Sequence, residues 1–187
     1  MRSGQVYKQF VAKNGSTITL RSSKWEDLDI AVAYVNELVI ESEQDQDFGI
    51  PFEERITRES EAKWLADSLV KMEEDSMISV VAELDGSIIG HTQVDKGTKS
   101  VNKYHGELGI SVAREFRNMG IGRELIKIAL DESRRIGVKT LTLRVFANNS
   151  RAIHVYEKIG FRQVGRIPNL VFRGDHFLDE IIMAIEL

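Results

Sequence analysis

The sequence predicts an α+β (mixed α/β) fold built on a mostly antiparallel sheet. Segments rich in β-branched residues alternate with amphipathic helical segments along the chain, and residues 76–113 contain three successive strand-like runs. A length of 187 residues with 42% hydrophobic residues suits one compact core. We therefore expect a single domain over residues 1–187, with residues 1 to about 14 as an N-terminal extension.

The first third of the chain predicts one strand and two helices. The run "STITLR" reads as a strand, and Ser22 or Ser23 can cap the helical run that follows it. Its apolar residues recur at helical spacing from Leu28 to Val39. A second helix is expected from about Thr57, in "TRESEAKWLADSLVKMEED".

The middle of the chain predicts a meander of three strands. The first two flank Asp85-Gly86, a dipeptide that favours a tight hairpin because its residues tolerate positive φ. The third is "YHGELGISVA", in which Gly109 indicates either a bulge or a splay. A helix from Gly120 to Ile136, the strand "VKTLTLRVF", a short helix ending at Gly160 and two final strands complete the order.

Composition excludes several classes of function. The net charge of −4 argues against a general nucleic-acid binder, which needs a basic face. There is no cysteine, so thiol nucleophiles, thiolate metal sites and disulfides are ruled out. The four histidines lack metal-ligand spacing, and we expect no metal. No apolar run is long enough for a membrane span or a signal peptide, which predicts a cytoplasmic protein.

The run "RNMGIG" at residues 117–122 opens the strongest helix. Glycine allows a ligand to approach the backbone, and the unpaired N–H groups of a first helical turn attract anions. Arg117 and Arg123 can add charge-assisted hydrogen bonds, so a diphosphate suits this loop. The alternative is a glycine turn with solvated arginines. The dinucleotide fingerprint fails at Leu125, and neither a Walker motif nor a nucleophile elbow is present.

Two motifs in this order closely resemble the GNAT superfamily of acetyl-CoA-dependent N-acetyltransferases. The first is [RQ]-x-x-G-x-[GA] at Arg117 to Gly122. The second is N-x-x-A-x-x-x-Y-x-x-x-G-F, with Asn149, Tyr156 and Phe161 among its positions. The resemblance is best over residues 76–165. It implies a GNAT fold, with a twisted sheet of about seven strands, helices on both faces, and a splay between the fourth and fifth strands.

The resemblance also implies a set of cofactor-binding residues. The glycine loop would hold the diphosphate of coenzyme A, and main-chain groups of the preceding strand would bind the pantetheine arm and the acetyl carbonyl. Asn149 matches a contact to the pantetheine arm, although it also suits a helix N-cap. The expected set is Ile110, Ser111, Val112, Arg117, Asn118, Met119, Gly120, Ile121, Gly122, Arg123 and Asn149.

The resemblance gives Tyr156 the role of the acid that protonates the leaving thiolate. A phenol with a pKa of about 10 is protonated at neutral pH, and the alternative is a core tyrosine. The base is less defined, because Arg144 stands where some relatives carry a glutamate. Glu107 is our candidate base; it is otherwise an outward-facing strand carboxylate. Glu180, Asp179 or an ordered water are alternatives.

The predicted function is transfer of an acetyl group from acetyl-CoA to a primary amine by direct attack in a ternary complex. The rival is a GNAT-fold module that binds acetyl-CoA or an amine without turnover. Polyamines, amino acids, protein N-termini and small drug amines all remain possible acceptors. The acidic residues Glu41, Glu43, Asp45 and Asp47 form either a solvated face or a surface that attracts a cationic amine. A homodimer is plausible from the resemblance.

Overall fold

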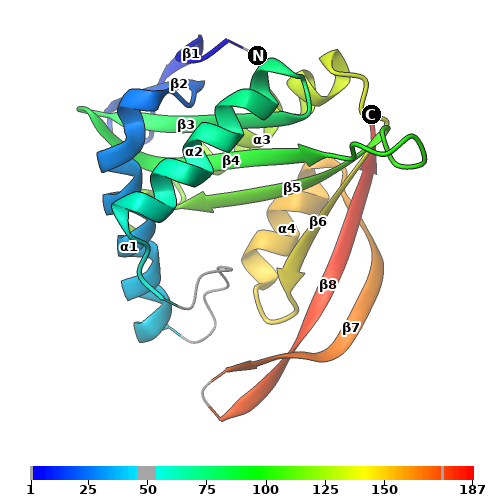
Figure 1. Cartoon of the computed structure of the whole chain (residues 1–187). Helices are drawn as coiled ribbons and strands as arrows, with labels where there is room; N and C mark the ends of the chain where they lie inside the picture. The colour runs from blue at the N-terminus through cyan, green and yellow to red at the C-terminus, as the bar shows by residue number, and fades with distance from the viewer. Residues whose placement is uncertain (1, 46–53, 174) are drawn as a thin grey trace.

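The computed structural model describes residues 2–45, 54–173 and 175–187. Figure 1 shows a single large sheet with helices packed against it. The strands are β1 (Val6–Val11), β2 (Thr17–Ser22), β3 (Met77–Leu84), β4 (Ser87–Lys96), β5 (His105–Val112), β6 (Thr140–Phe146), β7 (Arg162–Arg173) and β8 (His176–Glu186). The helices are α1 (Leu28–Gln44), α2 (Arg58–Glu73), α3 (Ile121–Arg135) and α4 (Ser150–Ile159), with 3₁₀ turns at Trp25–Asp27 and Arg114–Phe116.

The eight strands lie in the order β1-β2-β3-β4-β5-β6-β8-β7. All neighbouring pairs are antiparallel except β5 and β6, which are parallel. The α+β fold and the mostly antiparallel sheet are therefore confirmed. The sheet has one strand more than the approximate seven, because Val6–Val11, in the expected extension, pairs with β2.

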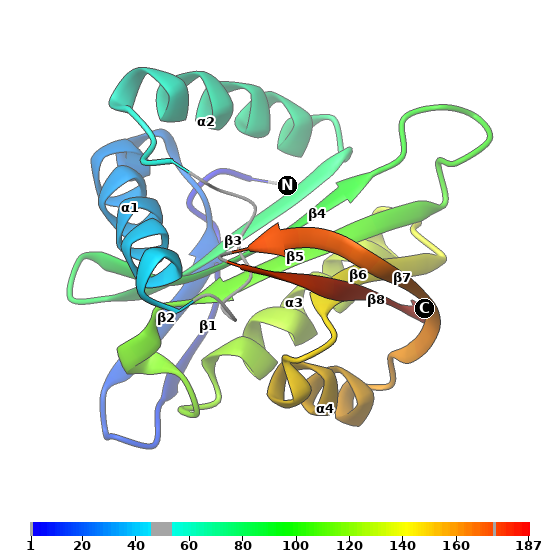
Figure 2. The same ribbon diagram turned by 90° about the horizontal axis from the view of Figure 1, so that it is seen from below.

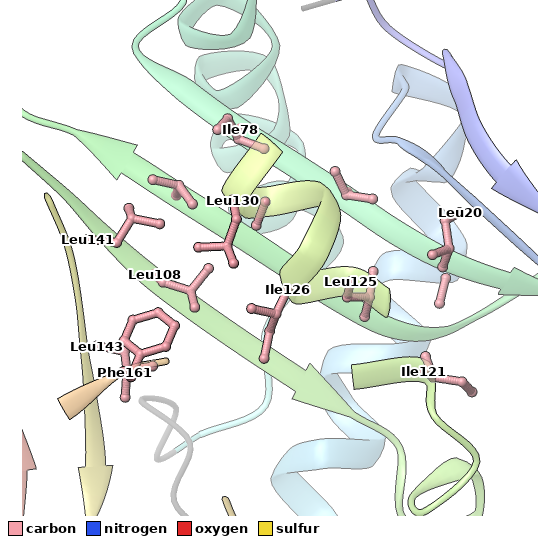
Figure 3. Close-up of a cluster of buried hydrophobic side chains, with 14 of the residues drawn as sticks. Leu20, Ile78, Leu108, Ile121, Leu125, Ile126, Leu130, Leu141, Leu143 and Phe161 are labelled. Carbon is pink, nitrogen blue, oxygen red and sulfur yellow. The ribbon is translucent and has the colours of Figure 1, made fainter. Parts of the chain in front are cut away.

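The helices cover both faces of the sheet. Figure 2 shows α1 and α2 on one side and α3 and α4 on the other. The larger core lies under α3 and α4, where Leu125 and Ile126 of α3 meet Ile78, Leu108 and other strand residues (Figure 3). A smaller core lies between α1 and the opposite face. Strand alternation explains the division, since Val80 belongs to the larger core and Val81 to the smaller one.

The expected helix cap at Ser22 or Ser23 is wrong, because their hydroxyls bond to the Arg2 carbonyl and to Ser79, and the N-caps of the Trp25–Asp27 turn and of α1 are Lys24 and Asp27.

Other local signals in the sequence act where they were expected. Asp85 and Gly86 take φ values of 48° and 80° in the hairpin between β3 and β4. Thr57 caps α2, since its hydroxyl accepts a hydrogen bond from the Ser60 N–H at 3.1 Å. Gly160 ends α4 with a φ of 115°. These features depend on neighbouring residues, which is why the sequence alone predicts them.

The parallel pairing of β5 and β6 is short. It runs from His105↔Thr140 to Glu107↔Thr142 and ends there, although both strands continue. Figure 1 shows the two strands diverging from this point. The predicted splay between the fourth and fifth strands of the expected sheet is present. Gly109 lies in the diverging part, and β5 keeps a continuous register with β4 there, so Gly109 marks the splay and not a bulge.

A buried ion pair fixes the connection from β2 to α1. The Arg21 guanidinium donates to both carboxylate oxygens of Asp27, at 2.8 and 2.7 Å, and its Nε donates to Glu83 at 2.6 Å. Arg21 is 5% exposed and Asp27 1%. Burial acts to lower the pKa of Arg21, but the hydrogen bonds to Asp27 and Glu83 outweigh it and raise that pKa.

In the described part of the chain, none of the helices combines the length and the apolar character that a membrane crossing requires.

Candidate functional site

The glycine loop, residues 117–122, presents the start of α3 to solvent. Asn118 and Gly120 both have positive φ, 67° and 91°, which turns the backbone sharply before the helix. In the described residues, no side chain caps the N-terminus of α3. A Cβ placed on Gly120 would meet nothing within 4 Å, so open space lies beside this backbone. The loop therefore fits the anion cradle expected from the sequence.

Arg117 contacts the protein itself. Its Nη1 and Nη2 donate to the two carboxylate oxygens of Glu41 in α1, at 2.5 and 2.6 Å, and its Nε donates to the Val112 carbonyl at 2.9 Å. The Glu41 side chain is only 7% exposed. The guanidinium of Arg117 therefore fixes the loop against α1 and β5. Arg123, in the first turn of α3, is the exposed arginine of the pair.

The surroundings of Glu41 contradict the interpretation of the acidic run as a solvated face. Glu41 is buried and ion-paired, so it does not belong to a solvated face. Glu43 is exposed. Asp47 lies outside the described residues. No short sequence pattern points to the pair between Glu41 and Arg117, because 76 positions separate its members.

The last residues of β5 alternate in the direction of their main-chain N–H and C=O groups. Ala113 N–H bonds to Ile89 at 3.0 Å, and the register with β4 is unbroken, so odd-numbered residues of β5 bond to β4. By the same alternation, the main-chain groups of Ile110 and Val112 face the edge from which β6 has diverged. Both residues thus direct their N–H groups toward the region between the diverging ends of β5 and β6, which we call the slot, and Ile110 also directs its carbonyl there, whereas the Val112 carbonyl already accepts from Arg117.

Ser111 is one of the odd-numbered residues of β5. Its main chain bonds toward β4, and its hydroxyl lies 2.9 Å from the hydroxyl of Tyr34 in α1. Tyr34 is buried, and this burial raises the pKa of its phenol despite the hydrogen bond to Ser111. Ser111 therefore contacts α1 through its side chain, on the face opposite to α3.

The residues of the second motif lie on α4 or directly next to its ends. The Asn149 side chain accepts a hydrogen bond from the Ala152 N–H at 3.1 Å, so it forms the helix cap. Tyr156 packs against the larger core, and its ring meets Phe161 edge-on with centroids 6.1 Å apart. Burial raises the pKa of Tyr156 to about 12. The phenol therefore keeps its proton at neutral pH.

The three acidic candidates for a base differ in their surroundings. Glu107 and Glu180 both pair with Arg144, whose Nε lies 3.2 Å from Glu107 and whose Nη1 lies 3.3 Å from Glu180. Asp179 instead accepts from the Asn169 N–H at 2.9 Å and pairs with Arg166 at 2.6 Å. These contacts, the Asn169 N–H first, hold the pKa of Asp179 below its usual value, which makes it a weaker base.

The four histidines lie on four different elements, with His91 on β4, His105 on β5, His154 on α4 and His176 on β8. His91 on β4 shares a hydrogen bond of 2.9 Å with Ser79 and meets the Trp64 ring edge-on. Burial lowers the pKa of His91 to about 4. His105 shares a hydrogen bond of 2.8 Å with Thr142 at the point where β5 and β6 separate. The expectation that the protein needs no metal stays a prediction.

Comparison with known proteins gives the family. The model of the acetyltransferase (GNAT) family matches residues 38–161, which is more than half of the chain. The chain therefore belongs to the GNAT acetyltransferase family. A solved structure with the same fold is a GNAT superfamily phosphinothricin acetyltransferase from Sinorhizobium meliloti in complex with acetyl-CoA. Its TM-score is 0.76 at 20% identity, over 91% of this chain and 88% of that one.

Two curated relatives come from Escherichia coli K12. An L-amino acid N-acetyltransferase is 28% identical over 106 residues, which cover 56% of this chain and 65% of the relative. A [ribosomal protein bS18]-alanine N-acetyltransferase is 37% identical over 78 residues, which cover 42% of this chain and 53% of the relative. The matched segments thus span less than two thirds of either relative.

Proposed function

We propose that this protein is an acetyl-CoA-dependent N-acetyltransferase that acts on a primary amine. The observation that carries the proposal is the divergence of β5 from β6 next to the N-terminus of α3, where Gly122 lies against the side chains of Ile110 and Val112. The family match and the named relatives support this activity. Acetyl-CoA is proposed as the acyl donor because a solved structure of the same fold contains it.

The glycine loop would bind the diphosphate through the N–H groups of residues 118–122, with the exposed Arg123 adding positive charge. Arg117 would act indirectly, by holding the loop in place. Ile110 and Val112 would donate main-chain hydrogen bonds to the pantetheine arm and to the thioester oxygen, on which negative charge develops. The side chain of Asn149 would orient the same arm while it caps α4.

Glu107 would remove a proton from the acceptor ammonium, and Tyr156 would donate a proton to the leaving thiolate. Glu107, or Glu180 beside the same arginine, accepts a proton from the ammonium, which frees the nitrogen lone pair. The nitrogen then bonds to the thioester carbon, and it loses its remaining surplus proton to solvent as the carbon–sulfur bond breaks. Tyr156 donates its phenolic proton to the departing sulfur. With no cysteine in the chain to form a thioester with the acetyl group, direct transfer in a ternary complex is the simplest route.

The test is release of free coenzyme A from acetyl-CoA, measured with a panel of amino acids, peptides, polyamines and aminoglycosides. The proposal predicts release that depends on an added amine and scales with its concentration. Tight acetyl-CoA binding without release on the whole panel would contradict it, and would favour a module that binds acetyl-CoA without turnover.

A further inference from the structure

Arg144 lies between two carboxylates contributed by different strands. Its Nε is 3.2 Å from Glu107 on β5, and its Nη1 is 3.3 Å from Glu180 on β8. The hydrogen bond to Glu180, followed by the two negative charges, raises the pKa of Arg144. Three strands thus bring one positive and two negative groups together.

This cluster lies at the narrow end of the slot. Glu107↔Thr142 is the last pair between β5 and β6, and Arg144 follows two residues later, where the strands have separated. Leu143 belongs to the core under α3 and α4, so strand alternation places Arg144 on the face that carries α1 and α2. On this face His105 contacts Thr142. A group bound to the cluster would therefore be close to the end of the slot.

Two of the three charged groups are accessible to a ligand. The side chains of Arg144 and Glu107 are each 51% exposed, whereas that of Glu180 is 9% exposed. Glu180 therefore anchors one side of the guanidinium from within the protein. The pair with Glu107 is open to solvent, and exposed ion pairs contribute little stability, so a ligand can replace it at small cost.

The charges favour one kind of acceptor. An amine without an anionic group would meet the positive charge of Arg144 beside the carboxylates that attract it. A free amino acid carries an ammonium and a carboxylate on the same carbon. Its carboxylate can take the place of Glu107 on the guanidinium, which has five donors and suits carboxylates. Its ammonium can then pair with the released Glu107, so every charge keeps a partner.

We propose that Arg144 binds the carboxylate of the acceptor, and that the acceptor is a free α-amino acid. This inference rests on the proposed function, and it adds a specificity-determining residue to it. The exchange leaves Glu107 beside the ammonium from which it would accept the proton.

The experiment compares acceptors that differ only in the carboxylate. Coenzyme A release is measured with leucine, leucinamide and 3-methylbutylamine, and with the matching sets for methionine and phenylalanine. Spermidine and a peptide with a free N-terminus are added. We expect kcat/KM for one or more amino acids to exceed that of its amide and its decarboxylated amine by at least tenfold. Equal or better use of the amides, the amines, spermidine or the peptide would overturn the inference.

Two variants of Arg144 and one control variant at Arg166 locate the effect. Arg144→Gln is expected to remove the preference for the carboxylate, mainly by raising KM for the amino acid, while acetyl-CoA affinity stays within about twofold. Arg144→Lys should restore part of the preference. Arg166→Gln removes an exposed arginine of β7 and should leave the preference intact. Equal preference in wild type and Arg144→Gln would contradict the role of Arg144. If Arg144→Gln does not fold, the wild-type comparison still decides the acceptor class.

Failure of the proposed function gives a different result. If no acceptor causes release of coenzyme A while acetyl-CoA still binds, the proposed acetyltransferase activity is contradicted. The proposed binding of an amino-acid carboxylate by Arg144 is not contradicted by this result. Calorimetry with the same amino acids and amides, in the presence of coenzyme A, then tests the recognition directly. Binding of an amino acid but not of its amide would support it, and equal or absent binding of both would overturn it.

Discussion

The guanidinium of Arg117 donates to both carboxylate oxygens of Glu41 and thereby joins the glycine loop to the last turn of α1. The same side chain bonds to the Val112 carbonyl at the end of β5. One arginine therefore connects three elements around the candidate site. The first residue of the [RQ]-x-x-G-x-[GA] motif orients the loop here, and in our proposal the N–H groups of the loop bind the diphosphate.

Glu41→Gln is expected to weaken acetyl-CoA binding although Glu41 belongs to α1. The substitution leaves a partly buried guanidinium without its charged partner, so the loop loses its fixed position. We expect the Kd measured by calorimetry to rise about tenfold, which corresponds to about 1.4 kcal/mol. Glu43→Gln removes an exposed charge two residues away and should leave Kd unchanged. A tighter Kd in Glu41→Gln would show that the negative charge of Glu41 opposes the ligand more than its pairing helps.

Tyr156→Phe is expected to lower kcat by about 100-fold with little change in acetyl-CoA affinity, because the phenol would donate its proton only as the thiolate leaves. Because the pKa of Tyr156 is raised to about 12, its proton is retained and the wild-type rate should show no loss from this group below about pH 11. Tyr104→Phe changes an exposed tyrosine and serves as the control. An unchanged kcat in Tyr156→Phe would remove this residue from the mechanism.

His91 should make the protein less stable as the pH falls from about 6.5 to about 4. Burial lowers its pKa to about 4 in the folded state, whereas the unfolded chain takes up the proton below about pH 6.5. The unfolded state thus binds more protons in this range, and the free energy of unfolding falls by up to about 3 kcal/mol. Urea titrations at pH 7 and pH 4 measure the change. His91→Gln should show a smaller fall, and an equal fall in both proteins would refute the assignment.

The buried pair of Arg21 and Asp27 should contribute strongly to stability. Asp27→Asn leaves the guanidinium without its main partner in a site where both residues are almost fully buried. The free energy of unfolding is expected to fall by about 3–5 kcal/mol. Asp131→Asn breaks the exposed pair with Arg134 and should cost less than about 1 kcal/mol. Similar losses in the two variants would mean that burial of the first pair has no special effect.

Local and periodic features were predictable from the sequence. The Asp85-Gly86 turn, the Thr57 cap and the helix that begins after Gly120 all follow from short stretches of residues. The strand Val6–Val11 was not predicted. Only a third of its side chains are partly buried and the rest are exposed, so the alternation of apolar and polar residues is weak. An edge strand needs few buried residues because its main-chain bonds to the neighbouring strand hold it in place.

The candidate site was predictable only where a motif marks it. Asn149 lies at the cap that its spacing indicates. The pairing of Arg117 with Glu41 and the bridge by Arg144 depend on contacts between distant segments, so the sequence offered the residues without their partners. One signal was Arg144 itself, which is the single charged residue of β6.

The central claim is that the backbone of the glycine loop binds the diphosphate of acetyl-CoA. Calorimetry of acetyl-CoA binding to Gly120→Glu tests it most directly, with Gly15→Glu as a matched control. Both glycines have positive φ, 91° and 88°, and a Cβ on either would meet nothing within 4 Å, so the backbone strain is similar. We predict that Gly120→Glu raises Kd by at least about 100-fold, or about 2.7 kcal/mol, while Gly15→Glu retains wild-type affinity. Wild-type affinity in a folded Gly120→Glu protein would contradict the claim.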